Sequence, residues 1–177
     1  RNRADAERII DYAQTETHAV VVGGGLLGIE SADALAATGL NVTLIHRSER
    51  LMGRQLDVVA SRMLQRTLNE RGIRTLMSDG ISRLTRTDRL TGLWTRSGKY
   101  IESGLVVWAT GVMPRVDLAR EAGLDVRSGV VVDRHLRTSD KSIYAIGEIA
   151  EFERMRWGQT IAAREQASAT AAHIAGE

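Results

Sequence analysis

Three glycines with a spacing that suits a phosphate group follow the first apolar run of this sequence. The run His18–Val22 is rich in valine, and the G-x-G-x-x-G spacing comes directly after it, at Gly23, Gly25 and Gly28. Gly23 permits a tight turn out of a strand, Gly25 lets the backbone approach a pyrophosphate, and Gly28 lets a helix lie close to that strand. The unpaired N–H groups at the start of such a helix attract phosphate charge. The pattern therefore predicts a dinucleotide-binding turn.

The residues on either side of the turn match a strand–helix–strand unit. A helix is expected from Leu26 to Thr38, with Gly39 as its stop, and a second strand from Asn41 to Ile45. A G-x-G-x-x-G pattern alone also occurs in purely structural turns. The strand before it, the helix after it and the second strand favour nucleotide binding, with Leu26 and Leu27 as further binding residues.

The residues after the second strand bear on which nicotinamide nucleotide would bind. An NAD-specific site places an acidic side chain on the ribose hydroxyls here, but this sequence has His46 and Arg47, followed by Arg50 and Arg54. One interpretation is a solvated charge cluster, and the other is that an arginine binds a 2′-phosphate. Glu49 argues for NAD. We favour NADPH, with His46, Arg47 and Arg54 as candidate binding residues.

The pattern of apolar and polar residues in the rest of residues 1–111 predicts an α/β fold. A Rossmann-like parallel sheet is expected to contain an antiparallel β-meander as an insertion. We expect Trp108, Val59 and Met63 to lie in the core. The expected elements are helices at Asn2–Ala13 and Gln55–Arg71, a strand at Ile73–Met77, meander segments at Gly80–Arg86, Leu90–Arg96 and Lys99–Ile101, and a returning parallel strand at Leu105–Ala109.

The sequence changes character after Pro114, its only proline. We therefore expect two domains, 1–111 and 112–177. The second should contain a short helix at Asp117–Ala122, strands at Gly129–Asp133 and Ile143–Ile146, a Gly147-Glu148 corner, and a helix at Thr160–Ala175.

Composition limits the classes of function. The 177 residues are 43% hydrophobic and 26% charged, and 24 basic side chains oppose 22 acidic ones, with the arginines scattered along the chain. A nucleic-acid partner is therefore not expected. Neither an apolar run of membrane-spanning length nor a signal-peptide pattern is present, which predicts a cytoplasmic protein without a membrane partner. Cysteine is absent and the four histidines are dispersed, so no disulfide, redox dithiol or metal site is expected.

Three motifs in order resemble one family, the flavin-dependent pyridine nucleotide oxidoreductases with two dinucleotide-binding domains. They are the glycine turn, Ala109-Thr110-Gly111, and the run Thr138–Glu148. Within that family, the glycine turn and the run Arg50–Asp57 are most similar to the large subunits of NAD(P)H-dependent assimilatory nitrite reductases. Electron-transfer subunits of assimilatory nitrate reductases are also similar, and rubredoxin and ferredoxin reductases come next.

The resemblance implies roles for both domains. Residues 1–111 would form the NAD(P)H domain with a leading helix, to which the motif residues Thr110 and Gly111 belong. Residues 112–177 would return into an incomplete FAD domain. In this family the FAD-binding glycine turn precedes the NAD(P)H domain. We therefore expect the chain to be a piece of a longer protein, and we expect this piece alone to bind nicotinamide nucleotide better than flavin.

The resemblance also implies roles for acidic side chains. Glu30 would lie near the nicotinamide, although it could equally be a surface carboxylate on a helix. Gly147 and Glu148 would lie beside FAD, where family members usually carry aspartate at the second position. The helix that contains Glu165 and Gln166 resembles the one that approaches the flavin ring, and the alternative for Glu165 is an exposed helix charge.

The implied reaction is hydride transfer from NAD(P)H to FAD, after which electrons pass to a downstream redox centre. The rest of the FAD domain and that centre are the expected partners, and the sequence leaves a homo-oligomer open. No catalytic acid or base is expected in this segment. Two alternatives stay open. A self-contained dehydrogenase is disfavoured because no tyrosine has a lysine four residues later. A non-catalytic nucleotide-binding module is the other.

Overall fold

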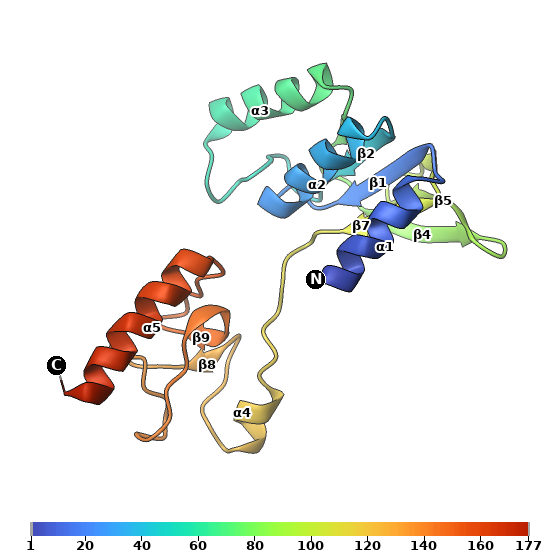
Figure 1. The fold of residues 1–177 in the computed structure, drawn as a ribbon. Coiled ribbons are helices and arrows are strands. Elements are labelled where there is room, and N and C mark those ends of the chain that lie inside the picture. Colours follow the sequence, from blue (N-terminus) through green and yellow to red (C-terminus); the bar gives the residue numbers. More distant parts are fainter. Residues whose placement is uncertain (1, 177) are drawn as a thin grey trace. The chain divides into compact units, whose positions relative to one another are not determined.

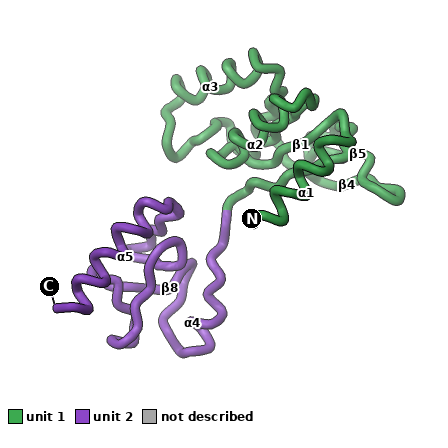
Figure 2. Tube along the Cα trace, viewed as in Figure 1, with its two compact units in different colours: residues 1–111 green, residues 112–177 purple. Residues whose placement is uncertain are grey.

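Two compact units make up the chain in the computed structural model, which describes residues 2–176. The units divide between Gly111 and Val112, and Figure 2 shows them in different colours. Unit 1 contains a sheet with helices, and unit 2 is built around one long helix (Figure 1). None of the helices within residues 2–176 is both long and apolar enough to cross a membrane.

A four-stranded parallel sheet forms the centre of unit 1. Its strands are β1 (His18–Val22), β2 (Asn41–Ile45), β3 (Arg74–Leu76) and β7 (Leu105–Trp108), in the order β3-β2-β1-β7. The register pairs Val20 with Thr43 on one side of β1 and with Val106 on the other. The predicted α/β fold with a parallel sheet is therefore confirmed.

The two faces of β1 pack against different layers, because alternate side chains of a strand point to opposite faces. Ala19 and Val21 join a core cluster with residues of α2 (Leu26–Ala37) and α3 (Val58–Glu70), and Ile9 and Ala13 of α1 (Arg3–Ala13) pack against that cluster. Val20 and Val22 join a second cluster with Leu93 and Ile101 of the meander. Burial on both faces explains why β1 is a continuous apolar run.

The meander consists of three antiparallel strands. They are β4 (Ile81–Arg86), β5 (Leu90–Thr95) and β6 (Tyr100–Glu102), as the sequence predicts within one or two residues. The Asp79 carboxylate fixes the start of this insertion, since it accepts hydrogen bonds from the Ser97 hydroxyl at 2.6 Å and the Gly80 N–H at 2.8 Å. Burial acts to raise the pKa of Asp79, but these hydrogen bonds outweigh it and hold the pKa below its ordinary value.

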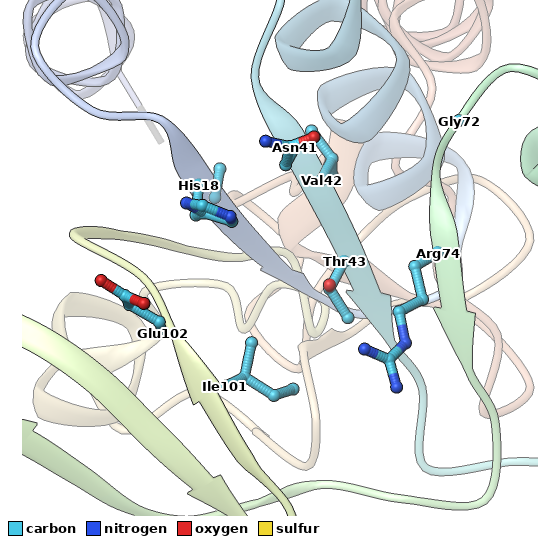
Figure 3. Close-up of a pocket in the computed structure, with 9 residues that line it drawn as sticks. His18, Asn41, Val42, Thr43, Gly72, Arg74, Ile101 and Glu102 are labelled. Carbon is cyan, nitrogen blue, oxygen red and sulfur yellow. The ribbon is translucent and has the colours of Figure 1, made fainter.

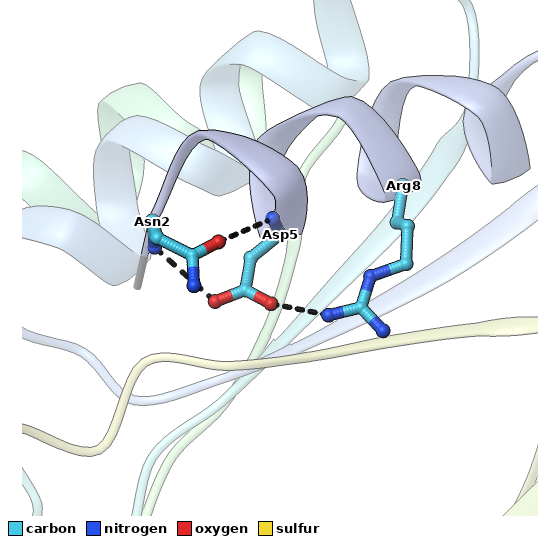
Figure 4. A network of polar contacts seen from close by, with 3 residues as sticks. All are labelled: Asn2, Asp5 and Arg8. Atoms are coloured by element: carbon cyan, nitrogen blue, oxygen red, sulfur yellow. Dashed lines mark hydrogen bonds and ion pairs between the residues drawn. The ribbon is translucent and has the colours of Figure 1, made fainter.

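The first helix, α1, begins with a capping box. The Asn2 side chain accepts the Asp5 N–H at 2.9 Å, the Asp5 carboxylate accepts the Asn2 N–H at 3.2 Å, and Arg8 donates to the same carboxylate (Figure 4). Such a box satisfies N–H groups that would otherwise lack a partner at a helix start.

Unit 2 carries a long helix beside short irregular elements. The carboxylate of Glu151 is buried and accepts hydrogen bonds from the Ser128 hydroxyl at 2.7 Å and the Gly129 N–H at 2.8 Å. These contacts hold the pKa of Glu151 below its ordinary value despite burial. The elements of the unit are α4 (Asp117–Glu121), β8 (Val130–Val131), the 3-10 turn η1 (Gly147–Ile149), β9 (Ala150–Glu151) and α5 (Thr160–Ala175).

Three predicted elements differ from the structure. The strand expected at Gly129–Asp133 is limited to Val130–Val131. The helix expected from Gln55 begins at Val58, because Asp57 caps it by accepting the Ala60 N–H at 2.8 Å. The strand expected at 143–146 is absent, and only Tyr144 of that run forms an isolated bridge, with Arg137. The backbone groups of Ile143 and Ala145 form hydrogen bonds with the preceding turns instead of with a neighbouring strand, so no regular ladder forms.

Three predicted core side chains are exposed. Trp108 is 58% exposed at the last residue of β7, although its register partner Val22 belongs to the cluster that the meander covers. Val59 and Met63 are 67% and 66% exposed, since the core-facing positions of α3 are Leu64 and Leu68. The prediction was wrong for Val59 and Met63 because the apolar stripe of α3 is wider than the face that the helix buries.

Candidate functional site

The glycine turn lies at the carboxyl ends of three neighbouring strands of unit 1. The Gly23 N–H donates to the Ile45 carbonyl at the end of β2, and the Ala109 N–H, just after β7, donates to the Val22 carbonyl, both at 2.8 Å. From β1 the chain moves to β2 on one side, and β7 returns on the other side. In open α/β sheets this reversal of strand order is where ligands bind.

Two of the motif glycines are required by packing. Gly23 has φ +124°, and a Cβ there would stand 2.7 Å from the Ala109 carbonyl carbon. A Cβ on Gly28 would overlap the Gly23 carbonyl oxygen and stand 2.9 Å from the Gly23 carbonyl carbon. Both glycines therefore let β1, α2 and the end of β7 come together.

Gly25 differs, because no packing contact requires glycine there. Apart from Gly25 and its two chain neighbours, no heavy atom of the described residues lies within 4 Å of where its Cβ would stand, and its φ of −89° is open to any residue. Gly25 is the N-cap residue of α2 and offers no side-chain cap to the first turn, in which Leu26 and Leu27 are exposed. A helix start without a capping side chain has unpaired N–H groups. Unpaired N–H groups at a helix start can bind an anionic group.

His46 contacts the glycine turn itself. Its Nδ1 accepts the Gly24 N–H at 3.1 Å, so the ring carries no proton on that nitrogen. Burial lowers the pKa of His46 below its ordinary value, and the positive charge of Arg47 adds to that effect. The candidate residue at the end of β2 is therefore a neutral imidazole bound to the backbone of the turn.

The loop after β2 closes on the same glycine. The Met52 N–H donates to the Gly24 carbonyl at 2.8 Å, and the Leu51 side chain is fully buried. A Cβ on Gly24 would lie 2.6 Å from Leu51 Cδ2 and 2.7 Å from His46 Cγ, which explains a glycine outside the G-x-G-x-x-G spacing. We did not predict this role for Leu51 and Met52, and the extra glycine was the signal for it.

The arginines of this loop are available to a ligand. Arg47, Arg50 and Arg54 are exposed, and their guanidinium groups form no ion pair with other described residues. The loop after β2 therefore places these guanidinium groups on the side of the glycine turn where a nucleotide's adenosine ribose would lie.

Thr110 and Gly111 follow β7 at the other side of the turn. Both are exposed, and the Thr110 nitrogen would lie 3.2 Å from a Cβ on Gly23. Glu30 is exposed on α2, two residues after Gly28, and makes no hydrogen bond to another described residue. The structure thus brings the predicted residues of unit 1 to one end of the sheet.

The predicted residues of unit 2 form a separate group. Gly147 has φ +74°, opens the turn η1 with Glu148, and donates its N–H to Gln166 Oε1 of α5 at 2.7 Å. Glu165 is exposed. Gln166 rather than Glu165 therefore links α5 to the Gly-acid corner, and a hydrogen bond of this kind has no signature in the sequence.

A hollow of about 350 Å³ lies at the opposite end of the parallel sheet. It is lined by His18 and Asn41, which begin β1 and β2, by Arg74, which begins β3, and by Ile101 and Glu102 of β6 (Figure 3). Since the glycine turn is at the carboxyl ends of the strands, this hollow is not the nucleotide site. Within residues 2–176 no cluster of three or more histidine or acidic side chains could hold a metal ion.

Comparison with known proteins agrees with this geometry. The family model for pyridine nucleotide-disulphide oxidoreductases matches residues 1–167. The nitrite reductase (NAD(P)H) of Bacillus subtilis (strain 168) is 36% identical over 176 residues, which are 99% of this chain and 22% of that protein. The assimilatory nitrate reductase electron transfer subunit of the same strain is 37% identical over 179 residues, 99% of this chain and 23% of that protein.

A solved structure shows the same similarity in three dimensions. The ferredoxin reductase from Rhodopseudomonas palustris superposes with a TM-score of 0.96 at 33% identity, over 100% of this chain and 46% of that chain. The chain spans less than a quarter of the length of the two curated relatives and less than half of this structure.

Proposed function

Since this chain belongs to the pyridine nucleotide-disulphide oxidoreductase family, we propose that it binds NAD(P)H at the glycine turn within a longer flavoprotein. One observation carries the proposal: Gly25 borders open space at an uncapped helix start, while Gly23 and Gly28 are held by packing. When bound, the two cofactors supply hydride transfer from the nicotinamide to the flavin.

The residues of unit 1 bind and orient the nucleotide. The backbone N–H groups that follow Gly25 hold the pyrophosphate at the positive end of α2. Thr110 and Gly111 border the nicotinamide side, and Glu30 contacts the nicotinamide region. Arg47 and Arg54 hold a 2′-phosphate, since an arginine fork matches phosphate geometry. No side chain of the segment has to transfer a proton.

The residues of unit 2 serve FAD in the same proposal. Residues 112–177 form the returning part of a FAD domain, in which Glu148 follows Gly147 beside the flavin nucleotide. Gln166 fixes that corner through its bond to the Gly147 N–H. Glu148 is one methylene longer than aspartate, so its carboxylate reaches further from the turn.

The overall activity that we propose is that of a cytoplasmic nitrite reductase large subunit, which passes electrons on to a downstream redox centre. The 36% and 37% identities to the Bacillus subtilis proteins over nearly the whole chain support it. A ferredoxin reductase is the second candidate, favoured by the TM-score of 0.96.

Two measurements test the proposal. Titration calorimetry of the 177-residue chain with NADH and NADPH should show binding of at least one nucleotide, and the absence of both would refute it. The longer natural protein should show flavin absorbance that NAD(P)H bleaches without oxygen, and nitrite or a ferredoxin should then restore it. A flavin-free longer protein that still binds nucleotide would instead support a non-catalytic module.

A further inference from the structure

The imidazole of His46 contacts the backbone of the glycine turn. Its Nδ1 accepts the Gly24 N–H at 3.1 Å. The backbone of Arg50 favours the protonated ring, but burial outweighs it and keeps the pKa of His46 below its ordinary value. The neutral ring at the end of β2 thus holds the turn before α2 through one hydrogen bond.

Proton uptake would break the hydrogen bond between His46 and Gly24. An imidazolium has a hydrogen on both nitrogens. The Nδ1–H and the Gly24 N–H would then be two donors that point at each other, and they would repel where a hydrogen bond now forms. Gly24 lies between Gly23 and the N-cap residue Gly25, and its carbonyl accepts the Met52 N–H. A displaced Gly24 therefore disturbs both the start of α2 and the loop.

The surroundings favour the neutral ring at neutral pH. Burial lowers the pKa of His46, and the positive charge of Arg47, the next residue in the chain, lowers it further. On the other side, the Asp79 N–H donates to the His46 carbonyl, while the Asp79 carboxylate is engaged by Ser97 and Gly80. The glycine turn contributes no titratable side chain. Acid is therefore needed to charge the ring.

We propose that His46 is a positioning residue that makes nucleotide binding depend on pH: its neutral ring holds the phosphate-binding turn in place, and its protonation releases that turn. The inference rests on the proposed function, since it concerns the same nucleotide site. The attraction of a charged ring for phosphate opposes the effect, but it requires the ring to stay beside the turn, which the opposed Nδ1–H and Gly24 N–H prevent. The lost hydrogen bond decides the direction.

Calorimetric titration with NAD⁺ tests the proposal, because its diphosphate stays ionised in the range where histidine titrates, between about pH 5.5 and about pH 8. Wild-type affinity should fall about tenfold from the upper to the lower pH. His46→Leu should bind weakly at both pH values. His46→Asn should restore the affinity without the pH dependence, because asparagine Oδ1 takes the position of Nδ1 and does not titrate.

A matched control and a second readout separate the outcomes. His18→Asn changes an exposed histidine at the opposite end of β1 and should keep the wild-type profile. The Gly24 amide resonance should shift with the His46 titration in the wild type, which decides the question even where His46→Leu fails to fold. A pH-independent wild type, or His46→Asn with the same acid loss, would overturn the proposal. No binding of NAD⁺, NADH or NADPH at the upper pH would instead refute the proposed function.

Discussion

Substitutions at Gly25 and Gly28 test whether one glycine of the turn is required for ligand binding and the other for packing. A valine Cβ at Gly25 meets no atom of the described chain within 4 Å, and φ −89° with ψ −178° is extended backbone that valine adopts. At Gly28 an alanine Cβ would overlap the Gly23 carbonyl oxygen. We therefore expect Gly25→Val to fold and lose nucleotide binding, and Gly28→Ala to lose stability.

The expected magnitudes follow from these contacts. Valine is a poorer N-cap residue than glycine, which costs about 0.5–1 kcal/mol of stability. One lost charge-assisted hydrogen bond to phosphate costs about 1.5–3 kcal/mol, or roughly 10- to 150-fold in the dissociation constant. Forcing the backbone apart at Gly28 costs about 1–3 kcal/mol in the free energy of unfolding.

Two assays on the same samples decide the matter. Urea unfolding followed by circular dichroism measures the free energy of unfolding, and calorimetric titration with NADH and NADPH measures affinity. Gly25→Ala adds a graded control, because a single methyl group intrudes less on the ligand than valine does. Unaltered affinity in Gly25→Val, or a Gly28→Ala protein as stable as the wild type, would refute the division of roles.

Individual side chains give three further outcomes. Arg47→Gln with Arg54→Gln should weaken NADPH binding roughly tenfold in calorimetry and spare NADH; equal losses would contradict the 2′-phosphate role. Asp79, whose pKa is lowered by hydrogen bonds that outweigh burial, contributes stability that is complete above about pH 4 and is lost as pH falls through that lowered pKa. Asp79→Asn should thus lower the free energy of unfolding in urea by about 1–3 kcal/mol at neutral pH, with a smaller difference near about pH 3. Gln166→Leu should speed hydrogen exchange at the Gly147 amide, and unchanged exchange would show that this bond does not hold the corner.

The sequence predicts the first strand–helix–strand unit almost to the residue because local chemistry decides it. The apolar run, Gly23 and Gly39 mark the ends of β1 and α2, and β2 matches its predicted range from Asn41 to Ile45. Long-range contacts decide what sequence reasoning got wrong. Trp108 is exposed although it continues the apolar run of β7, and no pattern within β7 distinguishes it from the buried residues before it.

In the candidate site, too, local residue patterns indicate some features and long-range contacts decide others. The glycines and the arginines are candidates that the sequence itself indicates, because residue type and spacing reflect the chemistry expected of them. His46 could be placed at the end of β2, but its bond to Gly24 depends on how the loop through Leu51 folds back. The hydrogen bond between Gln166 and Gly147 joins residues 19 apart in sequence, and neither residue type signals it.

The four glycines of the turn, at positions 23, 24, 25 and 28, have different structural roles, although the sequence pattern does not distinguish them. Gly23 and Gly28 serve the packing of β1, α2 and the end of β7, and Gly24 serves the loop through His46 and Leu51. Only Gly25 borders space that the described chain leaves open. A relative that kept this fold but lost its nucleotide would therefore retain Gly23 and Gly28 under selection for stability, while position 25 became free to accept side chains. The G-x-G-x-x-G spacing by itself therefore indicates the fold, and the proposed ligand role depends on the open space beside Gly25.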